Sequence, residues 1–293
     1  MLPMSKSRNG SAPSGTVVVI NTEVPIPYAM SVDFENLERA IVSAIKNDVE
    51  DQDIAVAFSG GLDSGLVAAI SKDYARSVTL YTSGRDQSYD VVMAQEMSER
   101  LGLPWLHIPI TEDNIESRLR EMITITGTSS PLTLSFELPM FFVCRTVHEK
   151  YIIGGQGSDE LFYGYNKYVG LSDDELVRAR KSDLGKLISS TIPHETMVAD
   201  HFGKKIFYPY MDPLVTMQVN AMDLDVLKPK DGDSRKMLLR DIARDLGYPF
   251  IADKRKKAAQ YGSGTMDLVR KVAKDKGMTY SELVDSIYRD IFE

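Results

Sequence analysis

The sequence predicts an α/β fold in which a parallel sheet is continuous with a largely helical C-terminal half. Between residues 54 and 153, short apolar runs of strand length alternate with segments of helix length. Glycine-rich loops follow the first and the last of these runs, and helical patterns dominate from about residue 158 onward. Strands that are separated by helices form right-handed βαβ units, and the strands of such units pair in parallel.

The composition is that of a water-soluble globular protein. The chain has 293 residues, of which 43% are hydrophobic and 26% charged, so it has ample material for a core. The formal net charge of -8 argues against broad binding to nucleic acid. The single cysteine, Cys144, excludes an intrachain disulfide and a cysteine zinc site, and this usage fits a reducing cytosol. Because no apolar stretch is long enough to span a bilayer, we expect a cytoplasmic protein.

The N-terminal residues divide into a leader and the start of the fold. Residues 1–15 are rich in Ser, Gly and Pro and contain no acidic residue, which predicts a disordered leader. Residues 17–20 favour a short edge strand. Ser31 is a suitable N-cap for a helix whose apolar residues recur at helical spacing, namely Phe34, Leu37, Ile41 and Ile45.

The alternating region supplies the strands and helices of the predicted sheet. Strands are expected at 54–58, 78–82, 105–109 and 151–153, and helices at 64–75, 87–101, 111–125 and about 135–149. We therefore expect a single domain over 16–293, with a nucleotide-binding half at about 31–160 and a helical half at about 161–293.

A last helix is predicted near the C-terminus. Thr279 and Glu282 form a capping box at its start, and Leu283, Ile287 and Ile291 follow at four-residue spacing. This apolar stripe suits either a homodimer contact or a helix that faces the core.

The segment after the first predicted strand, Ser59-Gly-Gly-Leu-Asp-Ser64, has the features of a phosphate-binding loop. Gly60 and Gly61 allow a tight turn whose backbone amides converge on an anion. Asp63 and Ser64 lie where the next helix presents its unpaired N–H groups and the positive end of its dipole. The Walker spacing G-x-x-x-x-G-K-[ST] is absent, and an ordinary strand-to-helix turn is the alternative interpretation.

Two further loops are expected at the same edge of the sheet, because open parallel sheets bind ligands outside the carboxyl ends of their strands. The loop after the second strand contains Ser83, and the loop after the fourth is Gly154-Gly-Gln-Gly-Ser-Asp-Glu160. The alternative for the latter is a glycine turn whose acidic residues only favour a helix dipole. If the two glycine loops meet, Asp63 and Asp159 can hold Mg²⁺, which takes one or two carboxylates and completes its shell with phosphate oxygens.

Five ordered blocks make the sequence similar to a known family. The loop 59–64 and the block Gly155-Gln-Gly-Ser-Asp-Glu-Leu-Phe-Tyr-Gly-Tyr165 resemble the synthetase domain of the asparagine synthetase and β-lactam synthetase family. The block Tyr208-Pro-Tyr-Met-Asp212 resembles that family's P-F-L-D. Lys236-Met-Leu-Leu-Arg240 follows, and then Arg255-Lys-Lys257 with Gly262-Ser-Gly264. The resemblance implies a sheet of the ATP-pyrophosphatase (adenine nucleotide alpha hydrolase-like) type.

The resemblance also implies a reaction in two steps. A carboxylate attacks the α-phosphorus of ATP, which gives an acyl-adenylate and pyrophosphate, and an amine then displaces AMP to form an amide. Binding of ATP and of its pyrophosphate falls on Ser59, Gly60, Gly61, Asp63, Ser64, Ser83, Gly155 and Lys236. Mg²⁺ binding falls on Asp63 and Asp159, catalysis on Lys257, and substrate orientation on Asp212. The residues themselves leave open a solvated helix lysine for Lys236 and a turn-forming aspartate for Asp212.

Two features depart from the family pattern. The asparagine synthetases carry an N-terminal glutaminase domain with a cysteine nucleophile, whereas Cys144 lies in an apolar segment in mid-chain and is expected to be buried. We therefore expect free ammonia, another amine, or ammonia from a separate glutaminase partner. Gln156 stands where the asparagine synthetases have a glutamate, and an amide positions a substrate but cannot accept a proton. Ammonia-dependent asparagine synthesis is therefore expected to be slow or absent.

Two other classes of protein stay open at this point. Enzymes that modify tRNA, the thiolases and lysidine-forming ligases, share the S-G-G-x-D-S loop. A single cysteine and an acidic net charge disfavour both sulfur transfer and RNA binding. A non-catalytic ATP-binding subunit needs Asp63 and Asp159 but not Lys257. The leading interpretation is an ATP-dependent, glutaminase-independent ligase that forms an amide from a small-molecule carboxylate.

Overall fold

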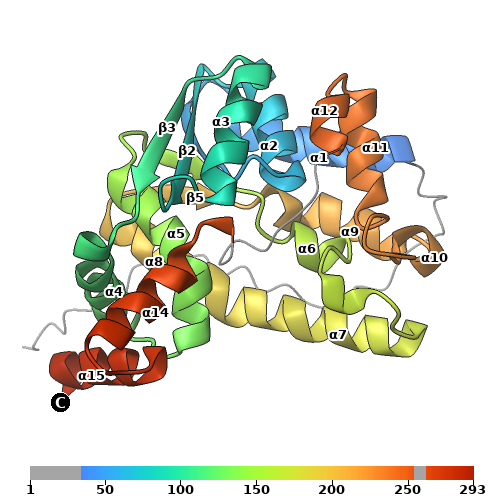
Figure 1. Ribbon diagram of the computed structural model, residues 1–293. Coiled ribbons are helices and arrows are strands. Elements are labelled where there is room, and N and C mark those ends of the chain that lie inside the picture. The colour runs from blue at the N-terminus through green and yellow to red at the C-terminus, as the bar shows by residue number, and fades with distance from the viewer. Residues whose placement is uncertain (1–33, 254–261) are drawn as a thin grey trace, which may run out of the picture. The chain divides into compact units, whose positions relative to one another are not determined.

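The computed structural model describes residues 34–253 and 262–293, and within them a five-stranded sheet with the order β3-β2-β1-β4-β5 (Figure 1). The strands are β1 (Asp53–Ala57), β2 (Ser77–Gly84), β3 (Trp105–Pro109), β4 (Tyr151–Ile153) and β5 (Lys205–Phe207). Each neighbouring pair is parallel, which confirms the βαβ pattern. The chain runs outward from β1 to β3 and then returns to the other side of β1. The loops after β1 and β4 therefore leave adjacent strands at a topological switch point, where open sheets bind ligands.

The helices of the first half follow the predicted alternation. They are α1 (Phe34–Val49), α2 (Leu62–Tyr74), α3 (Tyr89–Leu101), α4 (Glu112–Thr126) and α5 (Pro131–Thr146). The predicted apolar face of α1 is buried at Leu37, Ile41 and Ile45. α5 begins earlier than predicted because the Ser130 side chain accepts the Thr133 amide and so caps the helix.

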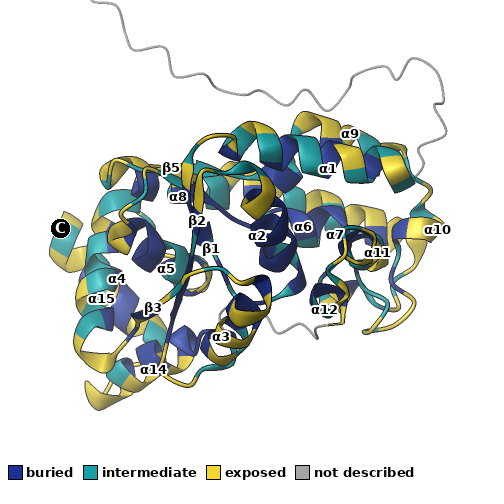
Figure 2. Ribbon diagram, turned by 90° about the horizontal axis from the view of Figure 1, so that it is seen from above, coloured by how far each residue is buried: buried dark blue, intermediate teal, exposed yellow. Residues whose placement is uncertain are grey.

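The pleat of the sheet divides the hydrophobic core into two clusters. Ile54 and Val56 of β1 belong to the first cluster, together with residues of α1, α2 and α3, whereas Ala55 belongs to the second, with α4 and α5. β4 repeats the pattern, because Ile153 lies in the first cluster and Ile152 in the second. Figure 2 shows the strands and α2 as buried elements between exposed helix faces. A strand covered on both faces reads as an unbroken apolar run, as β1 does.

Helices dominate the second half of the chain. The α-helices are α6 (Ser158–Leu161), α7 (Asp173–Lys186), α8 (Ile192–His201), α9 (Pro213–Ala221), α10 (Leu224–Leu227), α11 (Met237–Asp245), α12 (Pro249–Ala252), α14 (Thr265–Asp275) and α15 (Tyr280–Phe292). Two 3₁₀ turns, η1 (Asn166–Tyr168) and η3 (Pro209–Met211), and a π-helical turn, η2 (Leu187–Thr191), connect them. The expectation that strands are absent beyond about residue 158 is wrong, because β5 pairs with β4. β5 has three residues, too few for a periodic signal.

The last helix confirms the predicted capping box. Thr279 and Glu282 form that box at the start of α15. Leu283 and Ile287 are buried in the second core cluster, so the apolar stripe faces the core. Cys144 is buried in the same cluster, as expected.

Several predictions lie outside the described residues. They are the leader 1–15, the edge strand 17–20, the Ser31 cap and Lys257. The described residues all belong to one unit of the chain, Val32–Glu293. Over the described ranges, we find no helix with the length and apolar character needed to cross a membrane.

Candidate active site

The first glycine loop turns sharply between β1 and α2. Gly60 has a φ of +69°, and a Cβ at this position would lie 2.6 Å from backbone atoms of Met93 and Ala94 in α3. Both the left-handed conformation and the close approach therefore require glycine. Gly61 precedes α2 without a side-chain cap, so no side chain competes with a ligand for the first N–H groups of that helix.

Two serines close this loop. The Ser64 Oγ atom accepts a hydrogen bond from the Ser59 amide at 3.2 Å, and the two hydroxyl oxygens are also 3.2 Å apart. Both hydroxyls are thereby held beside the N-terminus of α2, where the helix dipole favours an anion.

The third loop lies directly against the first. A Cβ on Gly155 would lie 2.9 Å from Asp63 Cβ and 3.1 Å from the Ser64 amide nitrogen. The Gly154 amide donates to the Phe207 carbonyl at 3.3 Å, so the unpredicted strand β5 helps to hold the loop. The two glycine loops therefore meet at the switch point, as the sequence predicts.

Lys236 joins the two loops. Its Nζ atom donates to both carboxylate oxygens of Asp63 at 2.7 Å and to Ser158 Oγ at 3.0 Å, and it lies 2.6 Å from Asp159 Oδ1. Gly164 makes room for this arrangement, because a Cβ there would overlap Asp159 Oδ1 and Lys236 Cε. We call Lys236, Asp63, Asp159 and Ser158 the Lys236 cluster; it connects segments that are far apart in the sequence.

Lys236 is a buried cation held in an uncommon backbone conformation. It is only 4% exposed, so the interpretation as a solvated helix lysine is wrong. Burial disfavours the charged amine, but the carboxylates of Asp159 and Asp63 outweigh this effect and raise the pKa of Lys236. Its φ of +57° is unusual for a residue other than glycine. Such a conformation costs about 1–3 kcal/mol and persists where the surrounding contacts enforce it.

The Lys236 cluster fits a divalent cation. The Asp63 and Asp159 side chains are each 19% exposed, so both remain accessible while they share one cationic atom. Mg²⁺ binds with one or two carboxylates and takes its other ligands from phosphates and water. Consistent with such a shared shell, the described residues contain no group of three or more His, Cys, Asp or Glu side chains that could hold a metal ion by themselves.

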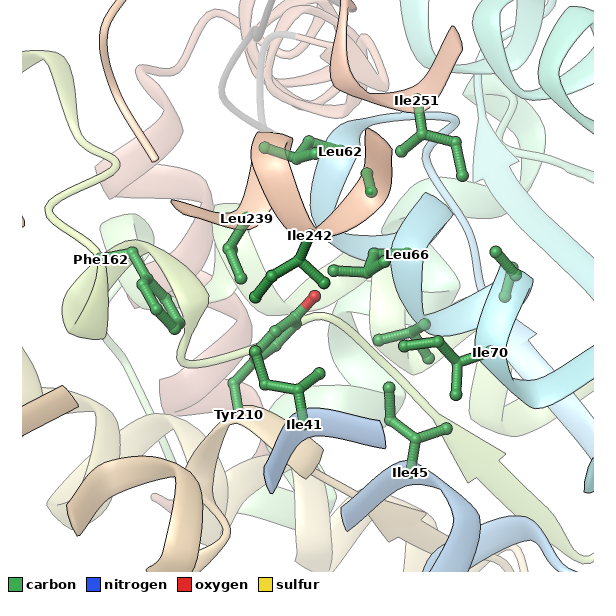
Figure 3. Close-up of a cluster of buried hydrophobic side chains, with 14 of the residues drawn as sticks. Ile41, Ile45, Leu62, Leu66, Ile70, Phe162, Tyr210, Leu239, Ile242 and Ile251 are labelled. Atoms are coloured by element: carbon green, nitrogen blue, oxygen red, sulfur yellow. The ribbon is translucent and has the colours of Figure 1, made fainter. Parts of the chain in front are cut away.

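The block 208–212 contributes to the site through a residue that the sequence reasoning missed. Tyr210 is fully buried in the first core cluster, near Ile41 and Ile242 (Figure 3). Its hydroxyl donates to the Asp63 backbone carbonyl at 3.1 Å and so supports the first loop. Asp212 instead caps α9, because its carboxylate accepts the Leu214 amide at 2.7 Å. The signal for Tyr210 was present, since an aromatic residue occupies the middle of a family block.

The third loop is supported from its own C-terminal side. The Tyr165 hydroxyl donates to Glu160 Oε1 at 2.6 Å. Burial raises the pKa of Glu160, and this hydrogen bond partly offsets the effect. Ser158 is also buried, and its hydroxyl binds Lys236, a contact that the sequence alone did not indicate.

Ser83 and Gln156 show no contact with the Lys236 cluster. The buried Ser83 hydroxyl donates to the Pro139 carbonyl in α5 at 2.8 Å. Gln156 is half-buried in the third loop between its glycines. Their roles in binding ATP and substrate stay predictions.

The segment directly after the Lys257 block lies at the carboxyl edge of the sheet. The Ser263 carbonyl accepts the Arg85 amide, just beyond β2, at 2.8 Å. A Cβ on Gly262 would overlap the Asp90 carboxylate at the start of α3. Gly262-Ser-Gly264 is therefore packed against the loop that follows β2.

The fold and the site together define a class of protein. It is a parallel α/β protein with an anion-binding glycine loop and a lysine–carboxylate cluster at the switch point of its sheet. Within that class, the chain belongs to the asparagine synthase family, whose model matches residues 36–244. The matched range includes both glycine loops and Lys236.

Two curated relatives show the extent of the similarity. The chain is 26% identical over 298 residues to a putative glutamine-hydrolysing asparagine synthetase 1 of Methanocaldococcus jannaschii, covering 88% of this chain and 55% of that protein. It is 31% identical over 256 residues to a glutamine-hydrolysing asparagine synthetase 1 of Lotus japonicus, covering 77% of this chain and 41% of that protein. The chain thus spans about half the length of these relatives. Among solved structures, an NMN synthetase from Francisella tularensis is 16% identical with a TM-score of 0.43, covering 87% of this chain and 86% of that chain, a likeness too low to support an argument.

Proposed function

We propose that this protein is an ATP-dependent, AMP-forming carbon–nitrogen ligase, which adenylates a carboxylate and transfers the acyl group to ammonia or another amine. The observation that carries the proposal is the Lys236 cluster, in which two carboxylates from two glycine loops face one buried lysine beside the N-terminus of α2. Membership of the asparagine synthase family supports it.

In this proposal each described residue acts through the contacts it already makes. Ser59, Ser64 and the first N–H groups of α2 bind the leaving pyrophosphate. Asp63 and Asp159 hold Mg²⁺, which neutralises charge on the phosphates when it is bound. Lys236 contributes a fixed positive charge that needs no reorganisation during the reaction.

The residues beyond this cluster are assigned by the resemblance alone. Lys257 is proposed to stabilise the charge that develops in both steps, and Asp212 to orient the substrate. Gln156 is proposed to position the acyl group or the amine by hydrogen bonds. Because its amide is no proton acceptor, we expect little asparagine from aspartate, ATP and free ammonia. Robust asparagine formation by the purified protein would contradict this expectation.

The proposal is tested by exchange of labelled pyrophosphate into ATP. The protein is incubated with ATP, Mg²⁺ and a panel of carboxylates, and we expect exchange that depends on one class of carboxylate. Asp159→Ala should abolish it, because one metal ligand and its charge are lost. Asp173→Ala is the control, since Asp173 pairs with Lys228 on the surface.

Three outcomes separate the classes of protein. ATP binding without exchange for any carboxylate would favour a non-catalytic subunit. Exchange that requires tRNA would favour a tRNA-modifying enzyme. Unchanged exchange in Asp159→Ala would refute the assignment of that residue.

A further inference from the structure

A second cluster of buried titratable side chains lies between α5 and α8, outside the Lys236 cluster. A small cavity there, with about 150 Å³ of space not filled by protein atoms, is lined by Glu137, Glu195, His194, Met122, Met140 and Phe141. Sequence reasoning missed this cluster because its members belong to no motif. We call it the acidic cavity.

The two carboxyl groups of the acidic cavity are buried with few partners. Glu137 is 2% exposed, and its carboxylate lies 3.1 Å from His194 Nδ1. Glu195 is 5% exposed, and its Oε2 atom has no hydrogen-bond partner among the described residues, although the Tyr208 hydroxyl is close enough to lower its pKa. Buried charged groups in proteins are normally paired, so an unpartnered carboxyl oxygen that lines a cavity points to a missing ligand.

The electrostatics of the cavity point to a cation. Its lining, within the described part of the chain, contains no lysine or arginine. Burial and the neighbouring Glu195 raise the pKa of Glu137 to about 9, and burial and Glu160 raise the pKa of Glu195 to about 7. Burial also lowers the pKa of His194, so the imidazole supplies little positive charge near neutral pH. A bound cation would therefore favour the ionised carboxylates.

The acidic cavity adjoins the third loop of the active site. Met140 lines the cavity, and its Cε atom is 3.6 Å from the place where a Cβ on Gly154 would lie. The π-helical turn η2, which directly precedes α8, approaches the same loop, because Leu187 Cδ2 is 3.7 Å from the Cβ position of Gly157. Glu195 follows on α8.

We infer that the acidic cavity binds a short primary alkylammonium ion, the amine that attacks the acyl group. Glu195 and Glu137 balance the charge of the ammonium group, and the Phe141 ring offers a cation–π contact. The unbranched, flexible side chains of Met122 and Met140 adapt to the alkyl chain. Free ammonium would leave this apolar lining without contacts. The role of the amine as attacking group rests on the proposed function, but its binding does not.

The test measures binding to the full-length protein by calorimetry. The probes are n-butylammonium chloride, ammonium chloride and the neutral n-butanol. We expect n-butylammonium to bind at least about tenfold more tightly than ammonium, and n-butanol not to bind measurably. Glu195→Gln should weaken n-butylammonium binding about tenfold, because it removes a charge-assisted hydrogen bond. Glu149→Gln is the matched control, since Glu149 lies outside the cavity and accepts a hydrogen bond from Tyr81 at 2.9 Å.

Equal affinity for ammonium and n-butylammonium, or binding that neither Glu195→Gln nor Glu137→Gln weakens, would overturn the inference. If Glu195→Gln does not fold, Glu137→Gln and the three probes on the unmodified protein decide. Failure of the proposed function is distinguishable, because it would abolish pyrophosphate exchange while n-butylammonium still binds. Exchange without n-butylammonium binding would remove the cavity assignment alone.

Discussion

The Lys236 cluster and the acidic cavity are both built from buried side chains that include two carboxyl groups, and they differ in the presence of a cation. In the Lys236 cluster, one buried ammonium group lies within 2.7 Å of two carboxylates, and its raised pKa keeps it charged. In the acidic cavity, burial raises the pKa of both Glu137 and Glu195. The first cluster is therefore complete without a ligand and holds two loops together. The second reaches charge balance only when a cation enters it.

Removal of the built-in cation should have the largest effect. Lys236→Met leaves Asp63 and Asp159 facing each other without a counter-charge, and breaking a buried ion pair from one side costs about 3–5 kcal/mol. We expect a loss of unfolding free energy near the lower end of this range, because both carboxylates retain some exposure. Pyrophosphate exchange should disappear. Chemical denaturation and the exchange assay measure the two effects.

A surface lysine provides the control for this variant. Lys228 also pairs with two aspartates, Asp173 and Asp225, but on the surface, where such pairs contribute little. Lys228→Met should therefore leave stability and exchange nearly unchanged. Addition of Mg²⁺ should raise the melting temperature of Lys236→Met more than that of the unmodified protein, because the two carboxylates then lack a cation. An equal shift in both proteins would contradict the proposed metal site.

The contact between the two glycine loops is the next point at which the Lys236 cluster can be broken. Gly155→Ala places a Cβ 2.9 Å from Asp63 Cβ, so the loops must separate by a few tenths of an ångström or more. Displacements of about 1 Å in an active site cost up to about 100-fold in rate, and we expect a loss of exchange between about 10-fold and 100-fold. Gly185→Ala in α7 is the control, since a Cβ there meets nothing within 4 Å. A fully active Gly155→Ala would show that the loop contact has no part in function.

Much of the first cluster could be predicted from the sequence, for a physical reason. Asp63 and Asp159 follow strands of the predicted sheet, and parallel strands carry their loops to one edge. The contact with Lys236 was only partly predictable, because it depends on how α11 packs against α2 and on the room left at Gly164. The family resemblance supplied what periodicity could not.

The acidic cavity had no comparable signal. Glu137 and His194 are 57 positions apart on two helices, and isolated charged residues in helical patterns are usually on the surface. Only the packing of α5 against α8 shows that both are buried. β5 was missed for a related reason, because three residues between two helical segments carry no periodicity.

The acidic cavity should reveal itself in the pH dependence of stability. The pKa of Glu137 is about 9 in the folded protein, against an ordinary value of 4.5 that the unfolded chain should approach. Between these values the folded state holds a proton that the unfolded state has lost, so stability falls as pH rises. The slope is at most about 1.4 kcal/mol per pH unit. The range from pH 7 to 9 isolates Glu137, because Glu195 has a pKa of about 7 and that of His194 is lowered.

Glu137→Gln should flatten this slope, since an amide does not titrate. Urea denaturation at pH 7, 8 and 9 measures the difference, with Glu149→Gln as the control. The same slope in Glu137→Gln and the unmodified protein would show that Glu137 does not hold its proton in the folded state. A flattened slope that n-butylammonium also produces in the unmodified protein would further support the cavity as a cation site.

The smallest effect is expected at a carboxylate that belongs to neither cluster. Asp212 caps α9 through the Leu214 amide, and loss of such a cap costs about 1 kcal/mol, so Asp212→Ala should be destabilised by this amount. Asp212→Asn keeps an acceptor and should retain both the cap and pyrophosphate exchange. It should also gain stability at pH 7 relative to pH 5, because burial and the Asp212 charge raise the pKa of Asp48 to about 6, and removal of that charge eases ionisation of Asp48. If Asp212→Asn instead folds normally but loses exchange, Asp212 orients the substrate, as the family resemblance implies, and the active site extends from the Lys236 cluster to the start of α9.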